Sequence, residues 1–203
     1  ETVVEVPGQP SGLGWTPDGD MLVVSMVDRA LWRHRDGVLE LVADLSDVAT
    51  WHCNDLVVDA SGRAYVGNFG WDEGTIPEVS GTALIAVEPD GTVSTVADDV
   101  VFPNGMVITP DGKTLIVAET FAARITAFDI DADGRLGNRR VWASFAENPA
   151  STTPELVESG VILPDGITLD SEGLLWVADA NGSGAVRVRE GGEIVQRIPV
   201  DEG

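Results

Sequence analysis

The sequence has a single cysteine, Cys53, among its 203 residues. An internal disulfide is therefore excluded, and nothing in the chain requires an oxidising compartment. No apolar run approaches the roughly 18 residues that a membrane-spanning helix needs. The first residues also lack the basic and then apolar pattern of a signal peptide. We therefore expect a cytoplasmic location without a membrane partner.

Positive charge is also scarce. Lys113 is the only lysine, and 12 Lys and Arg residues stand against 34 Asp and Glu, which gives a net charge of −22. Nucleic-acid binding requires clustered basic side chains that displace counterions from phosphates. The arginines of this chain are scattered singly or in pairs, so the sequence argues against a nucleic-acid partner. The hydrophobic share of 43% is that of an ordered globular protein with a buried core.

A repeated pattern runs through the whole chain. Four segments align, each with a short polar start, an apolar run, a glycine-containing turn and a second apolar run that ends in a polar residue. They are PSGLGWTPDGDMLVVS from Pro10, CNDLVVDASGRAYVGN from Cys53, PNGMVITPDGKTLIVAE from Pro103 and PDGITLDSEGLLWVAD from Pro164. Glycine supplies the positive φ that a tight hairpin turn requires. Each segment therefore predicts two antiparallel strands.

A second hairpin pattern of strand, glycine turn and strand follows each of these segments, at residues 30–45, 83–99, 124–145 and 185–200. Four short strands per repeat are the content of one propeller blade. The sequence thus predicts an all-β fold, a β-propeller with about four complete four-stranded blades, in a single domain over residues 1–203.

Two segments lie outside this repeat. Residues 2–6, TVVEV, are predicted to be the outermost strand of a further blade, so that the chain would be part of a larger ring. Residues 146–163 are predicted to form a surface loop with at most one helical turn. No segment keeps a 3.6-residue apolar period, and we expect no long helix.

The second residue of each aligned segment is polar: Ser11, Asn54, Asn104 and Asp165. The first strand of every propeller blade lines the central channel, so equivalent residues at the start of this strand should converge. A hydroxyl, two amides and a carboxylate are oxygen donors that suit Ca²⁺ or Mg²⁺ and accept Mn²⁺ or Zn²⁺. The alternative is that the Asn-Gly and Asp-Gly pairs only form turns, which is their usual role.

Longer stretches of the chain resemble a known family. HCNDLVVDASGRAYVGNFG, FPNGMVITPDGKTLIVAETFAARITAFDIDADGRLGNRRVWA and LPDGITLDSEGLLWVAD, with PSGLGW near the start, closely resemble the SMP-30/gluconolactonase/luciferin-regenerating-enzyme family. The resemblance runs nearly end to end and implies a six-bladed propeller whose middle blades this chain matches. It further implies one divalent cation in the channel, Ca²⁺ in the first place with Zn²⁺, Mn²⁺ and Mg²⁺ as alternatives, and a small-molecule lactone as substrate.

The same resemblance assigns roles to individual residues. Asn104 of the FPNG motif would be a metal ligand, and Asp165 of the PDG motif both a metal ligand and the catalytic base. Asn54 of the ND motif would lie at the metal and the substrate. His52, two residues earlier, is positioned to contact the substrate, unless it is a partly buried packing residue. The family's third protein ligand, a glutamate in a Glu-Gly-Pro-like motif, has no match in this sequence.

The resemblance, together with these residues, implies a metal-dependent hydrolase that opens a small lactone. The cation would polarise the carbonyl, and Asp165 would activate the attacking water. A nucleophilic serine would need a paired histidine, and neither His34 nor His52 lies in such a motif. Two alternatives remain: a related esterase or phosphotriesterase-like hydrolase, and a non-catalytic metal-binding or scaffold propeller.

Other features have simpler interpretations. Asp129–Gly134 imitates the start of an EF-hand loop, but Arg140 stands where that loop needs glutamate, which predicts a polar turn. Cys53 is predicted to be a small buried hydrophobe. The aromatic residues Trp51, Phe69, Trp71 and Phe121 either wall the substrate pocket or belong to the core. Substrate selectivity is expected to depend on the loops 69–82 and 144–163.

Overall fold

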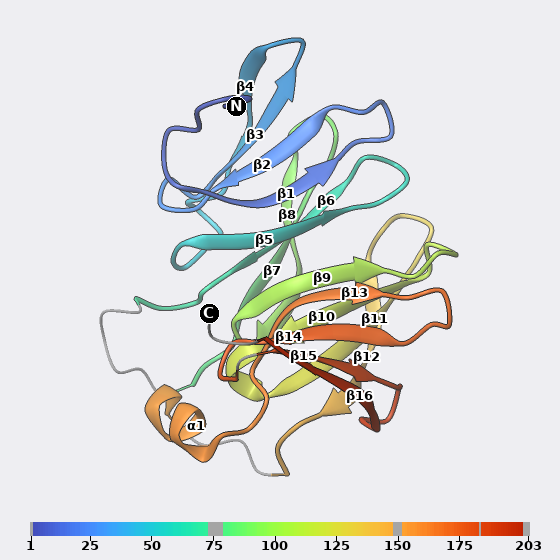
Figure 1. The fold of residues 1–203 in the computed structure, drawn as a ribbon. Helices are drawn as coiled ribbons and strands as arrows, with labels where there is room; N and C mark the ends of the chain where they lie inside the picture. Colours follow the sequence, from blue (N-terminus) through green and yellow to red (C-terminus); the bar gives the residue numbers. More distant parts are fainter. Residues whose placement is uncertain (1, 73–78, 148–151, 183, 201–203) are drawn as a thin grey trace. The chain divides into compact units, whose positions relative to one another are not determined.

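The fold consists almost entirely of short antiparallel strands. The computed structural model describes residues 2–72, 79–147, 152–182 and 184–200, and these contain sixteen strands in four four-stranded sheets (Figure 1). In each sheet the strands pair in chain order, as in a propeller blade. The prediction of an all-β chain with four complete four-stranded blades is confirmed.

The strand bounds follow the predicted repeat. The first blade contains β1 (Pro10–Trp15), β2 (Met21–Ser25), β3 (Ala30–Arg35) and β4 (Val38–Asp44), and the second contains β5 (Cys53–Val58), β6 (Ala64–Asn68), β7 (Thr82–Val87) and β8 (Val93–Val100). The third contains β9 (Pro103–Ile108), β10 (Thr114–Glu119), β11 (Arg124–Ile130) and β12 (Leu136–Ser144), and the fourth contains β13 (Pro164–Leu169), β14 (Leu175–Asp179), β15 (Gly184–Val188) and β16 (Ile194–Pro199).

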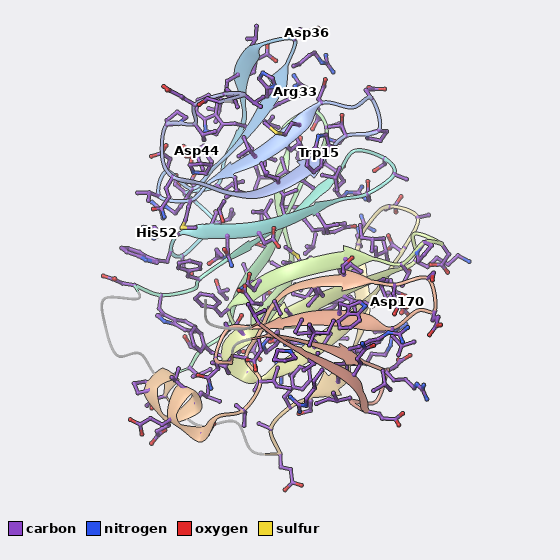
Figure 2. The ribbon with its side chains drawn as sticks, in the orientation of Figure 1. Trp15, Arg33, Asp36, Asp44, His52 and Asp170 are labelled. Atoms are coloured by element: carbon purple, nitrogen blue, oxygen red, sulfur yellow. The ribbon has the colours of Figure 1, made fainter. Side chains whose placement is uncertain are left out.

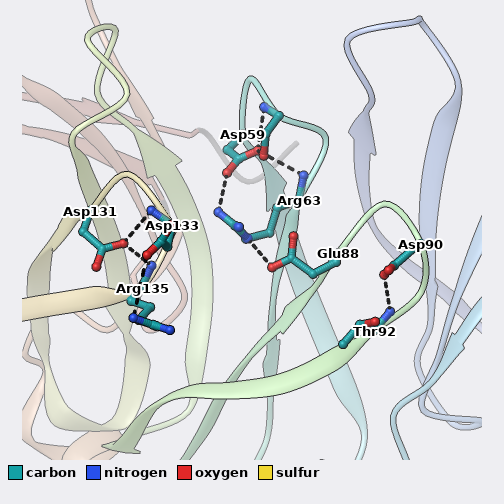
Figure 3. A network of polar contacts seen from close by, with 9 residues as sticks. Asp59, Arg63, Glu88, Asp90, Thr92, Asp131, Asp133 and Arg135 are labelled. Atoms are coloured by element: carbon teal, nitrogen blue, oxygen red, sulfur yellow. Dashed lines mark hydrogen bonds and ion pairs between the residues drawn. The ribbon is translucent and has the colours of Figure 1, made fainter.

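Glycine closes the turn between the first and second strand of every blade. These four glycines have φ between 71° and 90°, a region that other residues rarely adopt: Gly19, Gly62, Gly112 and Gly173. An acidic side chain often fixes the same turn from inside. The Asp59 carboxylate accepts hydrogen bonds from the Ser61 and Arg63 backbone N–H groups at 2.8 and 3.0 Å (Figure 3). The predicted turn chemistry is therefore confirmed.

The EF-hand-like segment is also a turn. It connects β11 to β12, where the Asp131 carboxylate accepts hydrogen bonds from the N–H groups of Asp133 and Arg135 at 2.9 and 2.8 Å (Figure 3). The Asp129 carboxylate is already engaged by Arg140 at 2.7 Å and by Asn138 at 2.8 Å. The carboxylates of this segment thus serve to close a hairpin.

The chain divides into two compact units of two blades each. Unit 1 comprises Glu1–Thr75 and Gly81–Val100 with β1 to β8, and unit 2 comprises Ile76–Ser80 and Val101–Gly203 with β9 to β16. That residues 1–203 form a single domain stays a prediction.

Each unit buries a core between its two sheets. In unit 1, side chains such as Leu22, Leu31, Leu56 and Ile85 from both blades form one cluster. In unit 2 the corresponding cluster includes Ile116, Ile125, Leu175 and Val186. The faces of two adjacent blades thus exclude water from each other, the usual way for packed sheets to bury apolar surface.

Cys53 belongs to the core of unit 1, as predicted. Its side chain is fully buried. Burial raises the pKa of its thiol to about 12, although Arg29 opposes the change. The thiolate is therefore not populated near neutral pH, and Cys53 is excluded as a nucleophile.

Two local predictions are wrong. Residues 2–6 form no strand, because no neighbouring strand in the described residues offers them a hydrogen-bonded ladder.

The segment 146–163 contains a helix, α1 (Thr153–Ser159), of nearly two turns rather than at most one. Pro154 stands in its first turn and Gly160 ends it in the left-handed conformation. Leu156 packs with Ala123 and Leu163, which stabilises a helix too short to persist alone.

One further helical segment, the 3₁₀ turn η1 (Thr120–Ala122), connects β10 to β11. In the described part of the chain, no helix is long and apolar enough to cross a membrane.

Candidate functional site

The four residues singled out by the repeat occupy the same structural position. Ser11, Asn54, Asn104 and Asp165 are each the second residue of the first strand of a blade, in β1, β5, β9 and β13. All four are half-buried. Because they start equivalent strands, these side chains lie at the same end of their blades.

The glycines beside these residues do not form turns. Gly12, Gly105 and Gly166 lie inside β1, β9 and β13, and none has a positive φ. The interpretation of the Asn-Gly and Asp-Gly pairs as turn formers is therefore wrong. The hairpin turns lie at the other end of the same strands, after Trp15, Ile108 and Leu169.

Two of these glycines permit neighbouring first strands to approach closely. A Cβ atom on Gly105 would lie 2.6 Å from the Asp165 carbonyl oxygen and 2.6 Å from the Ile167 nitrogen. In unit 1, a Cβ on Gly12 would lie 2.7 Å from the Asp55 Cα atom. A real Cβ atom essentially never comes this close to a non-bonded atom, so only glycine fits without a shift of the backbone. The close approach brings β9 against β13, and β1 against β5.

In unit 1 this approach joins two of the predicted site residues. The Ser11 hydroxyl donates a hydrogen bond to Asn54 Oδ1 at 3.4 Å. Two aromatic rings gather around His52: the Trp51 ring stacks on it at 4.7 Å, and the Phe69 ring lies 6.1 Å from it (centroid distances). Figure 2 shows His52 just before β5, and Asn54 follows it two residues later in the chain. The start of β5 therefore presents an amide beside a cluster of rings.

In unit 2 a single threonine joins the surroundings of Asn104 and Asp165. Thr120, the first residue of η1, is 3% exposed. Its hydroxyl donates a hydrogen bond to the Pro164 carbonyl at 2.8 Å. The same oxygen accepts a hydrogen bond from Asn104 Nδ2 at 3.2 Å. Within unit 2, the described residues offer the Asp165 carboxylate no hydrogen bond or ion pair.

Polar residues at the ends of the second strands support these positions: Ser25, Asn68 and Glu119 are buried, and Asp179 is half-buried. Each holds the segment that leads into the first strand of its own blade. The Ser25 hydroxyl oxygen accepts a hydrogen bond from the Gly8 N–H at 2.9 Å. Asn68 Oδ1 accepts a hydrogen bond from the Thr50 hydroxyl at 3.2 Å. The Glu119 carboxylate accepts a hydrogen bond from the Val101 N–H at 2.7 Å, and the Asp179 carboxylate accepts one from the Leu163 N–H at 3.1 Å. The sequence pattern had a polar residue at each of these positions, but its partner could not be read from the pattern.

Glu119 is the strongest of these anchors, since its side chain is fully buried. Its carboxylate accepts hydrogen bonds from Arg124 at 2.9 Å, from Arg139 at 3.2 Å and from the Thr126 hydroxyl. Burial alone would raise the pKa of Glu119, but hydrogen bonds from Arg124, Thr126 and Val101 outweigh it and lower the pKa below its ordinary value. Glu119 is thus an ionised, fully paired structural group, next in sequence to Thr120.

The donor chemistry of the predicted site fits a hard cation. Among the described residues, no three His, Cys, Asp or Glu side chains form a metal-binding group. The candidate donors are instead the amide oxygens of Asn54 and Asn104 and the carboxylate of Asp165. Such oxygen donors suit Ca²⁺ or Mg²⁺, whereas Zn²⁺ is usually selected by nitrogen and sulfur donors. The convergence of Asn54 with Asn104 and Asp165 on one ion stays a prediction.

A cavity of about 320 Å³ in unit 1 lies away from these residues. It is lined by turn residues such as Thr16, Ser61 and Pro89 and by the paired side chains of Asp20 and Arg35. These turns follow the far ends of β1, β5 and β7, close to where Figure 2 labels Trp15. Neither His52 nor Asn54 lines this cavity, so it is separate from the candidate site.

Four-stranded meander blades with polar residues at the equivalent end of every first strand define a β-propeller protein. The chain belongs to the SMP-30/gluconolactonase/LRE-like family, whose model matches residues 1–202. The resemblance inferred from the sequence motifs is therefore confirmed.

Individual relatives agree with this assignment. A regucalcin of Danio rerio is 32% identical over 148 residues, which are 72% of this chain and 45% of that protein. A pentonolactonase of Haloferax volcanii is 30% identical over 190 residues, 92% of this chain and 58% of that protein. A solved structure of a calcium-binding regucalcin from Agrobacterium tumefaciens is 26% identical with a TM-score of 0.73, covering 97% of this chain and 62% of that one. The chain thus spans less than two thirds of the length of each of these relatives.

Proposed function

We propose that this chain belongs to a metal-dependent hydrolase that opens a small lactone. The family assignment and a relative named as a pentonolactonase support the reaction class. The observation that carries the proposal is the arrangement in unit 2. There the Asn104 amide and the Asp165 carboxylate lie near the starts of the neighbouring strands β9 and β13. The Thr120 hydroxyl binds both the Asn104 amide and the Pro164 carbonyl, which directly precedes Asp165.

Asn104, Asp165 and Asn54 would hold one divalent cation. Ca²⁺ is the first candidate, because the donors are all oxygens and because one relative is described as calcium-binding. Mg²⁺, Mn²⁺ and Zn²⁺ are the alternatives. When bound, the cation supplies a Lewis acid that polarises the lactone carbonyl and stabilises the negative charge that develops on its oxygen.

Asp165 is proposed as the general base. Its carboxylate is half-buried and has no hydrogen bond or ion pair among the described residues of unit 2. It is therefore available to accept the proton of a water molecule that attacks the lactone carbonyl. The ring C–O bond then breaks, and the alcohol oxygen that leaves takes up a proton. No covalent intermediate is needed, in keeping with the buried and protonated Cys53 thiol.

His52 and Asn54 are proposed to contact the substrate. The His52 ring stacks on Trp51 at 4.7 Å, which orients the imidazole at the start of β5. An aromatic group with a polar edge suits a ligand that presents C–H faces and hydroxyl groups, as a sugar lactone does. Asn54 adds an amide whose oxygen already accepts one hydrogen bond from Ser11.

The proposal is tested by an activity screen after metal removal. The complete protein is dialysed against a chelator and assayed with aldonolactones, a simple aryl ester and a phosphotriester, before and after addition of Ca²⁺, Mg²⁺, Mn²⁺ or Zn²⁺. We expect no lactone turnover without metal and recovery with at least one of these ions, with lactones preferred over the ester and the phosphotriester.

Three other results would contradict this function. Full activity in the presence of the chelator would exclude the metal-dependent mechanism. Preference for the ester or the phosphotriester would favour a related hydrolase. Tight cation binding without turnover of any substrate would favour a non-catalytic metal-binding propeller.

A further inference from the structure

The Thr120 hydroxyl has only one hydrogen to donate, and this fixes the direction of its two hydrogen bonds. The Pro164 carbonyl can only accept, so the hydroxyl hydrogen is used there, at 2.8 Å. Toward Asn104 the hydroxyl oxygen can therefore act only as an acceptor. The group that faces it at 3.2 Å must be a donor, which is the Nδ2–H group of the Asn104 amide.

This pairing determines how the Asn104 amide is turned. If the amide were rotated by half a turn, its Oδ1 atom would face an oxygen whose only hydrogen is already engaged. The acceptor Oδ1 of the half-buried Asn104 would then face the buried acceptor oxygen of Thr120, which is unfavourable where water has little access. Thr120 is 3% exposed, so this orientation is strongly preferred. With Nδ2 held by Thr120, Oδ1 is directed away from it.

Thr120 itself is held firmly in place. Its backbone N–H donates to the Phe102 carbonyl at 3.3 Å, just before β9, and its carbonyl accepts from Ala123 N–H at 3.1 Å. The preceding residue, Glu119, is fixed by Arg124 and by the Val101 backbone at 2.7 Å. The hydroxyl is therefore a fixed point rather than a free rotor.

We propose that Thr120 is a positioning residue that orients the Asn104 amide so that Oδ1, and not Nδ2, is presented to the cation. The inference rests on the proposed metal site, because orientation matters only if Asn104 is a ligand. The hydrogen bond to the Pro164 carbonyl gives the same hydroxyl a second task. It holds the peptide group between Pro164 and Asp165. The Thr120 side chain therefore helps to position both proposed ligands, Asn104 and Asp165.

The test compares Thr120→Val with Thr120→Ser in the complete protein. Valine has nearly the shape of threonine but neither donates nor accepts a hydrogen bond, whereas serine retains the hydroxyl. Binding of Ca²⁺ and Mn²⁺ alone is measured by titration calorimetry, without substrate. Loss of a group that orients a ligand typically weakens metal binding by about 10- to 100-fold. We expect a loss of this size in Thr120→Val and affinity close to wild type in Thr120→Ser.

Thr126→Val is the matched control. Thr126 is also a buried threonine of the third blade, but its hydroxyl donates to Glu119 and does not contact Asn104. Its removal is expected to lower the thermal unfolding temperature while the cation affinity stays near that of the wild type. Equal losses of affinity in Thr126→Val and Thr120→Val would show a general structural effect and overturn the inference.

Two further outcomes separate the inference from the proposed function. If the wild type binds a cation and Thr120→Val binds it equally well, the role of Thr120 is wrong and the metal site stands. If the wild type binds neither ion while it remains folded, the metal site and the role of Thr120 both fail.

Discussion

Asp165→Asn is expected to lower kcat for lactone hydrolysis by about 10²- to 10⁴-fold, the usual contribution of a general base. Asparagine is nearly isosteric and keeps an oxygen for the cation, but it cannot accept the proton of the attacking water. The fold should be preserved, because the described residues of unit 2 include no hydrogen-bond or ion-pair partner for this carboxylate. The measurement is kcat at saturating cation, with the unfolding temperature of each variant recorded.

Asn104→Ala is the matched comparison for this substitution. It removes a proposed ligand but leaves the proposed base, so cation affinity should fall first and excess cation should recover part of the activity. Asp165→Asn should show the opposite pattern, with activity that added cation does not restore. A kcat equal to that of the wild type in Asp165→Asn at saturating cation would remove Asp165 from the role of base.

Gly105→Ala is expected to lower the free energy of unfolding by about 1–3 kcal/mol, the typical cost of overpacking. The added Cβ would lie 2.6 Å from the Asp165 carbonyl oxygen and 2.6 Å from the Ile167 nitrogen. Both are backbone atoms, so no side-chain rotation relieves the clash and β13 must move away from β9. Because Asn104 and Asp165 lie on these two strands, cation affinity should fall together with stability. Denaturant unfolding and calorimetric titration measure the two effects.

Gly166→Ala provides the control, because this glycine has the equivalent position in β13. A Cβ there meets no atom within 4 Å, and the residue has no positive φ. Its stability should therefore lie between that of the wild type and about 1 kcal/mol above it, since alanine restricts the unfolded chain. Equal destabilisation by the two substitutions would show that the close approach of β9 and β13 is not what requires glycine at position 105.

The parts of the fold that depend on neighbouring residues could be predicted from the sequence. The four hairpins that open the blades follow from short apolar runs and from turns whose glycines, such as Gly19 and Gly112, have φ of 90° and 71°. The family motifs likewise indicated Asn54, Asn104 and Asp165, and these three residues have equivalent positions in β5, β9 and β13.

The parts that depend on distant residues could not be predicted in the same way. Thr120 lies 16 residues after Asn104 and 44 residues before Pro164, so no local pattern indicates that its hydroxyl binds both. Gly105 was open to interpretation as a turn residue, because close packing of two strands leaves no mark on the sequence other than the glycine itself. The helix of α1 depends on burial of Leu156 against Ala123 and Leu163, which are also remote contacts.

The most direct test of the proposed metal site is a crystal structure of the complete protein with Ca²⁺, and with Mn²⁺ for its anomalous signal. The predicted result is a single ion bound by Asn104 Oδ1 and by the Asp165 carboxylate, at about 2.3–2.6 Å for Ca²⁺. Asn54 is predicted to lie in the same coordination sphere or just outside it, as a water or substrate contact. An ion bound elsewhere, with the oxygens of Asn104 and Asp165 pointing to opposite sides of their strands, would contradict the site and the function proposed for it.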